Sequence, residues 1–126
     1  MPRMALVVDD SMLIRYSVCR YFETRGFLVE SATNGLEALE MLRHIIPNII
    51  VTDLQMPKMT GNQLITILKG RPETAEVSIL VLAGKNSVSA LTEEPRANDV
   101  IYKDIDINEQ LDRALKAIFP ATRGSS

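Results

Sequence analysis

Short apolar runs alternate with amphipathic stretches along the chain. The apolar runs have the length and composition of buried strands, and they occupy residues 5–10, 27–32, 48–53, 77–84 and 99–103. Elsewhere apolar residues recur every three or four positions, as in helices that bury one face, at residues 11–26, 34–45, 60–70 and 106–119. Continuous apolar strands alternating with helices predict a doubly wound α/β domain, in which helices cover both faces of a parallel sheet.

Local signals agree with these boundaries. Three expected helices begin at an N-cap residue with Glu or Gln three positions later: Asn34 with Glu37, Thr60 with Gln63, and Asp106 with Glu109. Gly26 and Gly70 stand where two helices should end.

Two segments depart from the pattern. A further crossover helix belongs within residues 85–98, but Pro95 interrupts it and apolar positions are few, which predicts a short or distorted fourth helix. Residues 120–126 offer nothing to bury, so we expect one domain over residues 1–119 followed by a disordered tail or linker stub.

Composition narrows the class of protein. The 126 residues are 46% hydrophobic and 24% charged, as in a soluble globular domain, with a net charge of −2 and no cluster of Lys or Arg. Nucleic acid and anionic membranes are therefore poor partners by default. The apolar run at residues 5–8 is too short for a signal peptide or a membrane span.

Cysteine and histidine offer little chemistry. Cys19 is the single cysteine, so no internal disulfide can form, which fits a reducing cytoplasm. We expect a buried, inert thiol there, because its neighbours include Val18, Tyr21 and Phe22. We expect His44 on the surface of the second helix, and no zinc site.

Charged residues gather at the predicted carboxyl ends of the strands, where ligands bind in doubly wound sheets. Asp9 and Asp10 end the first strand, Asp53 the third and Lys103 the fifth. Asp10 alone could equally be a helix cap and Asp53 a turn residue. Together, three carboxylates on one rim would repel one another, and a hard cation such as Mg²⁺ would relieve that repulsion.

Three motifs together resemble the receiver domains of two-component response regulators, over about residues 4–119. "VVDDS" is similar to the family's acidic pair, "DLQMPKMTG" to the sequence around its phosphorylated aspartate, and "YK" to its fifth-strand lysine. The resemblance implies a flavodoxin-like fold with five parallel strands in the order 2-1-3-4-5. It also implies that Asp53 accepts the phosphoryl group, Asp9 and Asp10 bind Mg²⁺ with the backbone carbonyl of Gln55, and Lys103 binds the phosphoryl oxygens.

The sequence departs from the family at three positions. Ala83 stands where the family has a Ser or Thr hydroxyl, Val100 where it has an aromatic ring, and Asp104 where it has a proline. We expect weakened but not abolished phosphorylation, an altered switch, and a trans Lys103–Asp104 peptide. Tyr102 is not expected to replace the missing ring, because strand alternation points it away from the side of Lys103.

These features favour a cytoplasmic phosphoacceptor in a phosphorelay. It would receive phosphate from a sensor histidine kinase or a histidine phosphotransfer protein, and its only catalysis would be its own phosphorylation and slow dephosphorylation. A homodimer through the fourth-helix, fifth-strand and fifth-helix face is expected by resemblance. A pseudo-receiver that acts without phosphate is the alternative. A metal-dependent phosphohydrolase is disfavoured, since no second acid follows two residues after Asp53 or Asp9.

Overall fold

The computed structural model describes residues 2–84 and 94–120. Of the segment predicted to hold a fourth helix, residues 85–93 lie outside the described residues, and residues 94–98 are not helical. The tail after residue 120 also lies outside the described residues. The elements, in chain order, are β1 (Met4–Val8), α1 (Met12–Thr24), β2 (Leu28–Ala32), α2 (Gly35–Met41), β3 (Ile49–Asp53), α3 (Gly61–Gly70), β4 (Ser78–Ala83), β5 (Asp99–Tyr102) and α5 (Ile107–Ile118).

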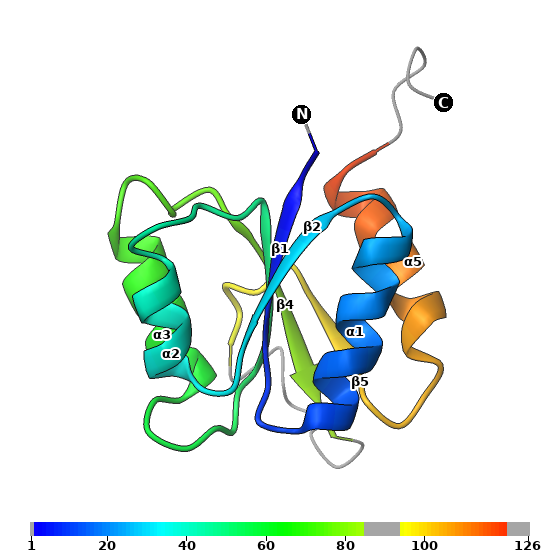
Figure 1. Ribbon diagram of the computed structural model, residues 1–126, viewed down its shortest axis with the longest axis horizontal. Helices are drawn as coiled ribbons and strands as arrows, with labels where there is room; N and C mark the ends of the chain where they lie inside the picture. Colours follow the sequence, from blue (N-terminus) through cyan, green and yellow to red (C-terminus); the bar gives the residue numbers. More distant parts are fainter. Residues whose placement is uncertain (1, 85–93, 121–126) are drawn as a thin grey trace.

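The five strands form one parallel sheet in the order β2-β1-β3-β4-β5, as predicted. Helices α2 and α3 lie on one side of this sheet, and α1 and α5 lie on the other (Figure 1). The chain therefore has the doubly wound α/β architecture in which the carboxyl ends of the strands share one rim.

Strand alternation divides the core into two apolar clusters. The first joins the sheet to α2 and α3, and its buried strand residues are Leu6, Val8, Ala32, Ile50, Ile79, Val81, Ala83 and Val100. The second joins the sheet to α1 and α5, and its strand residues are Ala5, Val7, Ile49, Val51, Leu80, Leu82 and Ile101. Because β3 is buried along its whole length, Asp53 at its end is held by a rigid strand.

The predicted helix signals are largely confirmed. Thr60 and Gln63 form a reciprocal capping box at the start of α3, and Asn34 and Asp106 each accept a backbone N–H at the starts of α2 and α5. Gly26, beyond α1, has a φ of +86°, a conformation that glycine adopts without strain. Helix α2 ends at Met41 and is shorter than predicted, since residues 42–44 form a turn.

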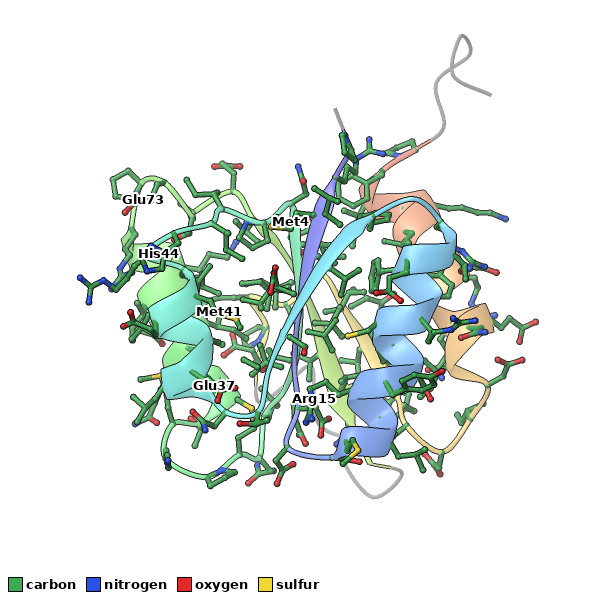
Figure 2. The ribbon with its side chains drawn as sticks, viewed as in Figure 1. Met4, Arg15, Glu37, Met41, His44 and Glu73 are labelled. Carbon is green, nitrogen blue, oxygen red and sulfur yellow. The ribbon has the colours of Figure 1, made fainter. Side chains whose placement is uncertain are left out.

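Cys19 differs from expectation in its exposure. It packs on the second cluster, with Val18, Tyr21 and Phe22, but it is only half-buried, beside a shallow groove between α1 and β2. Burial still raises the pKa of its thiol, which disfavours the reactive thiolate. His44 is exposed, as predicted, but it lies in the turn that follows α2 rather than on the helix (Figure 2).

None of the helices within residues 2–84 and 94–120 combines the length and the apolar character needed to cross a bilayer.

Candidate functional site: an acidic rim with one lysine

The predicted charged residues meet at the carboxyl end of the sheet. The Nζ of Lys103 lies 2.6 Å from Oδ2 of Asp53 and 3.0 Å from Oδ2 of Asp9. These three residues follow or end β5, β3 and β1, and the parallel sheet brings Lys103 to Asp53 across 50 positions of the sequence. Lys103 is therefore an ion-pair partner of both acids, rather than a solvated surface charge.

Asp53 is held at both carboxylate oxygens. Its Oδ1 accepts a hydrogen bond of 3.0 Å from the backbone N–H of Gln55, and its Oδ2 accepts one of 2.6 Å from Lys103. The residue is 8% exposed, so the carboxylate lies at the bottom of the rim but is reachable from solvent. A carboxylate oriented in this way can attack an electrophile that enters from the rim.

Asp9 is fully buried, and its two oxygens have different surroundings. Oδ1 accepts a 2.8 Å hydrogen bond from the N–H of Ser11. Oδ2 contacts Lys103 only as an ion pair and has no hydrogen-bond partner among the described residues. The Asp9 carbonyl accepts from Arg15, which reaches back from α1 toward the end of β1 (Figure 2). The contacts from Ser11 and Arg15 are not foreseen by any pattern in the sequence.

The acids and the lysine influence one another's protonation. Burial raises the pKa of Asp9, and this effect exceeds the opposing influence of the Ser11 hydrogen bond and of Lys103. Burial lowers the pKa of Lys103, but the hydrogen bond to Asp53 and the close negative charges of Asp53 and Asp9 outweigh it, so the pKa lies above its ordinary value. Lys103 therefore stays protonated. Its single positive charge does not balance the three carboxylates of the rim.

Asp10 completes a cluster of three carboxylates. One oxygen from each of Asp9, Asp10 and Asp53 lies within 4.8 Å of the others, and Asp10 is exposed while the other two are buried. The arrangement fits a hard divalent cation, because it supplies oxygen ligands, and because the buried Oδ2 of Asp9 accepts no hydrogen bond from the described residues. Within residues 2–84 and 94–120, no other group of His, Cys, Asp or Glu has this metal-ligating arrangement.

The loop after Asp53 is tightly folded against the strand. Gly61 donates its N–H to the carbonyl of Leu54 at 3.0 Å, and Lys58 adopts a positive φ of 72°. A Cβ on Gly61 would collide with the carbonyl oxygen of Asp53 and lie 2.8 Å from Cα of Leu54. The glycine is needed because the backbone of α3 approaches the end of β3 too closely for any side chain.

A pocket of about 180 Å³ opens beside Asp53, and Gln55, Ala83, Gly84 and Lys103 contribute to its wall. None of the described residues that line it carries a hydroxyl group. Thr52 faces away, as expected, and donates its hydroxyl to the carbonyl of Asp53 inside the core. The wall of this pocket therefore lacks the hydroxyl that a Ser or Thr at position 83 would supply.

Tyr102 has a different relation to Val100 than we inferred from the sequence. It does point away from the side of Lys103, but alternation also places it on the same face as Val100 and Ala83. In the register of the sheet, Tyr102 pairs directly with Ala83. An aromatic side chain therefore lies on the expected face, two residues nearer the rim. The inference that Tyr102 cannot replace the missing ring loses its geometric basis.

The Lys103–Asp104 peptide is trans, as predicted, since the structure has no cis peptide bond among its described residues. Asp104 itself is exposed. The chain therefore leaves β5 without the ring constraint that a proline would impose.

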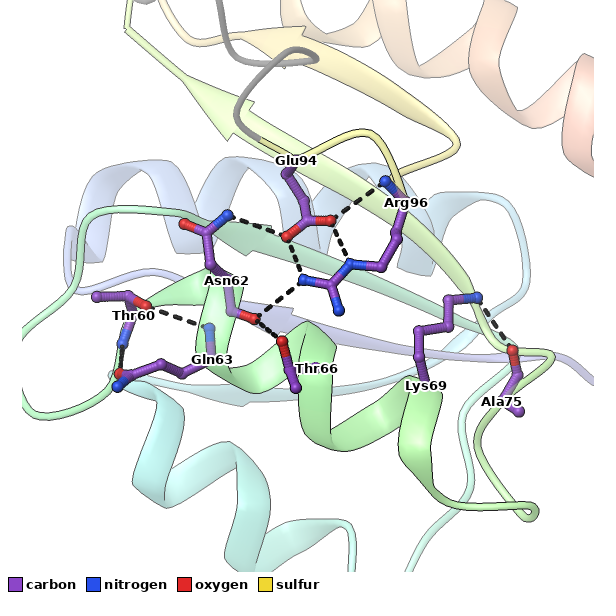
Figure 3. A network of polar contacts seen from close by, with 8 residues as sticks. All are labelled: Thr60, Asn62, Gln63, Thr66, Lys69, Ala75, Glu94 and Arg96. Atoms are coloured by element: carbon purple, nitrogen blue, oxygen red, sulfur yellow. Dashed lines mark hydrogen bonds and ion pairs between the residues drawn. The ribbon is translucent and has the colours of Figure 1, made fainter.

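A buried carboxylate that the sequence did not single out joins α3 to the segment before β5. Glu94 is 1% exposed and accepts hydrogen bonds from Nε and Nη2 of Arg96, at 2.7 and 2.8 Å, and from Asn62 at 2.9 Å (Figure 3). The hydrogen bonds from Arg96 lower the pKa of Glu94, so this carboxylate stays charged. Both carboxylate oxygens of Glu94 already accept hydrogen bonds. The network therefore stabilises the packing of α3 against the segment before β5 and is not a second metal site.

The chain matches the response regulator receiver domain family over residues 5–115. It belongs to this family. The response regulator MprA of Mycobacterium tuberculosis is 33% identical over 120 residues, which cover 94% of this chain and 51% of MprA. The receiver thus spans about half the length of the curated relatives that it matches.

Solved structures of response regulators have the same fold as this chain. The chemotaxis response regulator CheY4 of Vibrio cholerae matches with a TM-score of 0.82 and 25% identity, covering 94% of this receiver and 100% of that chain. A response regulator described as putative, from Chloroflexus aurantiacus, gives 0.85 and 27%, covering 94% and 98%. The flavodoxin-like fold of a receiver domain in two-component signalling, predicted from the motifs, is confirmed.

Proposed function

We propose that this receiver accepts a phosphoryl group on Asp53 in a Mg²⁺-dependent reaction. The observation that carries the proposal is the position of Asp53, whose Oδ2 lies 2.6 Å from Lys103 within a cluster of three carboxylates. A pseudo-receiver has no need of such a cluster, and the departures from the family lie at Ala83, Val100 and Asp104, outside it. The departures at Val100 and Asp104 bear on the output of the domain, and the missing hydroxyl at Ala83 weakens its chemistry without removing the nucleophile or the metal ligands.

The reaction would be an in-line displacement. A carboxylate oxygen of Asp53 attacks the phosphorus of a phosphohistidine or a small phosphodonor, and the bond from phosphorus to the leaving group breaks. An imidazole leaving group takes a proton from solvent, whereas acetyl phosphate releases acetate as the anion. Formation of the acyl phosphate removes the negative charge of the Asp53 carboxylate, so Lys103 would move its ion pair to the new phosphoryl oxygens. The N–H of Gln55 keeps the carboxylate oriented while this happens.

Asp9, Asp10, Asp53 and the carbonyl of Gln55 would hold the Mg²⁺ ion. When bound, the ion would neutralise charge on the phosphoryl oxygens and relieve the repulsion among the carboxylates. Without a hydroxyl at Ala83, one hydrogen bond to those oxygens is missing, at a cost of about 1.5–3 kcal/mol. Phosphorylation should be slower than with a hydroxyl but should still occur, and the chain would act as an enzyme only on itself.

A sensor histidine kinase or a histidine phosphotransfer protein is the proposed phosphodonor. The first turns of α1, directly after Asp10, expose apolar side chains at Met12, Leu13 and Tyr16, of which the first two are each 74% exposed. Exposed apolar side chains grouped beside a reactive site are typical of a surface that a protein partner covers. The same proposal places the chain in the cytoplasm, where such kinases hold their phosphohistidine.

Labelling of the wild-type chain tests the proposal. Incubation with acetyl phosphate and Mg²⁺ should add one phosphoryl group, detected by intact mass. Removing Mg²⁺ with EDTA should prevent the addition. A chain that stays unlabelled at saturating phosphodonor and Mg²⁺ would contradict the proposed function.

Mg²⁺ should also stabilise the fold. Binding to the native state alone adds about 2.7 kcal/mol at a free Mg²⁺ concentration about 100 times the dissociation constant, which should raise the melting temperature by several degrees. Asp10→Ala should remove this response, because the cluster loses its exposed ligand. The variant may be compared with Asp104→Ala, which removes an exposed carboxylate outside the cluster and should keep the response. An unchanged Mg²⁺ shift in Asp10→Ala would place the ion elsewhere.

The output switch should be atypical. Ala83 offers no hydroxyl for a phosphoryl group to pull, and Val100 has no ring to move. A ligand changes a conformation only through contacts that differ between two states. Beryllofluoride, a phosphoryl mimic, should therefore shift the amide NMR signals of Asp53, Gln55 and Lys103 strongly, and those of α5 weakly. Large changes over residues 100–102 and 111–118 would show that the domain switches by another route, for which Tyr102 is the obvious candidate.

A further inference from the structure

The side chain of Gln110 in α5 forms two hydrogen bonds with the main chain of β5. Its Oε1 accepts a hydrogen bond of 2.8 Å from the N–H of Tyr102, and its Nε2 donates one of 2.8 Å to the carbonyl oxygen of Tyr102. The same Nε2 lies 3.3 Å from the carbonyl oxygen of Asp106, at the start of α5. Gln110 is 8% exposed, so this amide is buried with both its donor and its acceptor used.

Lys103 directly follows Tyr102, the residue to which Gln110 is hydrogen-bonded. Its own N–H donates to the carbonyl of Ala83 at 2.9 Å, which fixes it to β4 on one side. On the other side β5 is the edge strand, so no further strand of the described sheet supports it. Gln110 supplies that second support through Tyr102.

The chain beyond Lys103 adds one weak restraint, a long hydrogen bond of 3.4 Å from the N–H of Ile105 to the carbonyl oxygen of Tyr102. Asp104 is exposed and Ile105 is 59% exposed, and the peptide that follows Lys103 is not fixed by a proline ring. Strand β5 is only four residues long. The direction in which Lys103 leaves the sheet is therefore set mainly by the hydrogen bonds at Ala83 and Tyr102.

We propose that Gln110 is a positioning residue for Lys103, which aims the ammonium group at Asp53 from α5. The inference rests on the proposed function, in which Lys103 meets the phosphoryl oxygens. Gln110 itself touches neither Asp53 nor Lys103 through its side-chain hydrogen bonds, all of which go to the main chain at Tyr102 and Asp106. It acts only through the backbone that carries the lysine.

The test is a double-mutant cycle with the phosphorylation rate as its readout. Gln110→Met keeps the length of the side chain and loses both hydrogen bonds, and it should slow labelling by acetyl phosphate about fivefold, since small misplacements of a catalytic group are costly. In a Lys103→Ala background the same substitution should change the rate by less than about twofold, because there is no ammonium left to position. An equal slowing in both backgrounds, or none in the wild type, would overturn the proposal.

Control variants separate positioning from general damage. Arg113→Ala, in the same helix, removes an exposed side chain whose ion pair with Glu109 spans 3.9 Å, and it should leave the rate unchanged. Gln110→Glu keeps the acceptor for the N–H of Tyr102 but not the donor, and its rate should be intermediate. If Gln110→Met is too unstable to assay, Gln110→Glu takes its place in the double-mutant cycle. The Mg²⁺-induced rise in melting temperature should persist in each of these variants, because the carboxylate cluster is intact.

Hydrogen exchange gives a readout that does not depend on chemistry. The Lys103 amide should exchange faster in Gln110→Met than in the wild type or in Arg113→Ala, because its bond to Ala83 loses support from α5. Absence of labelling in the wild-type chain would count against the proposed function. Normal labelling in Gln110→Met, with unchanged exchange at Lys103, would overturn the positioning role alone.

Discussion

Replacing Asp53 with asparagine is expected to abolish phosphoryl addition while leaving the fold intact. The amide has nearly the shape of the carboxylate, and its oxygen can still accept the hydrogen bond from the N–H of Gln55. It is not a nucleophile toward phosphorus, however, and it cannot form the acyl phosphate. Intact mass after incubation with acetyl phosphate and Mg²⁺ measures the effect directly, and circular dichroism reports on the fold.

Asp104→Asn is the matched control for this substitution. It makes the same chemical change on an exposed acid one residue after Lys103, outside the carboxylate cluster. Labelling of this variant should equal that of the wild type. Full labelling of Asp53→Asn would move the phosphorylation site to another acid, Asp9 and Asp10 being the nearest alternatives.

Gly61→Ala should produce the largest loss of stability among single-methyl changes near the site. The added Cβ meets backbone on both sides, at the carbonyl oxygen of Asp53 and at Cα of Leu54, and backbone cannot rotate away as a flexible side chain can. Overpacking of this kind costs about 1–3 kcal/mol. Urea unfolding should show a lower midpoint, and labelling should slow because the displaced atoms belong to Asp53.

Gly70→Ala provides the comparison. Gly70 is the last residue of α3, and a Cβ there would meet nothing within 4 Å. The same substitution should therefore be neutral or slightly stabilising, by up to about 1 kcal/mol. If both variants unfold at the same urea concentration, the close approach of α3 to β3 does not constrain the native state as described.

The strands, their parallel arrangement and the rim could be predicted because each rests on a local pattern. The apolar runs identify buried strands, and parallel strands place their carboxyl ends side by side, so Asp9, Asp53 and Lys103 had to converge. The order of the strands required more, since hydrophobic pattern alone does not say which strands pair. It followed from the resemblance to receiver domains.

The side of the sheet on which Tyr102 lies has to be compared with that of Val100 and Ala83, and not with that of Lys103. Comparison with Lys103 put the ring on the opposite side, which is correct, but the relevant neighbours were Val100 and Ala83. Residues two apart on a strand share a face, and the pairing of Tyr102 with Ala83 depends on the register between β4 and β5. Register is a tertiary property, and nothing in the local sequence specified it here.

Glu94 and Gln110 could not be identified beforehand for a related reason. The hydrogen bond from Asn62 to Glu94 joins residues 32 positions apart, and Gln110 reaches Tyr102 across a change from strand to helix. Both side chains are polar residues that would ordinarily face solvent. Their burial becomes apparent only when the packing of α3 and α5 against the sheet is known.

The hydrogen bonds between Gln110 and β5 also limit how two copies of the chain can associate. The outward N–H and carbonyl groups of Tyr102 are taken by Gln110, and the N–H of Val100 is taken by the carboxylate of Asp99. A strand from another molecule would find these groups already bonded, so this end of the sheet resists the edge-to-edge growth that leads to aggregation. A homodimer that uses the β5 and α5 face would have to associate through side chains, and its sheets would remain separate.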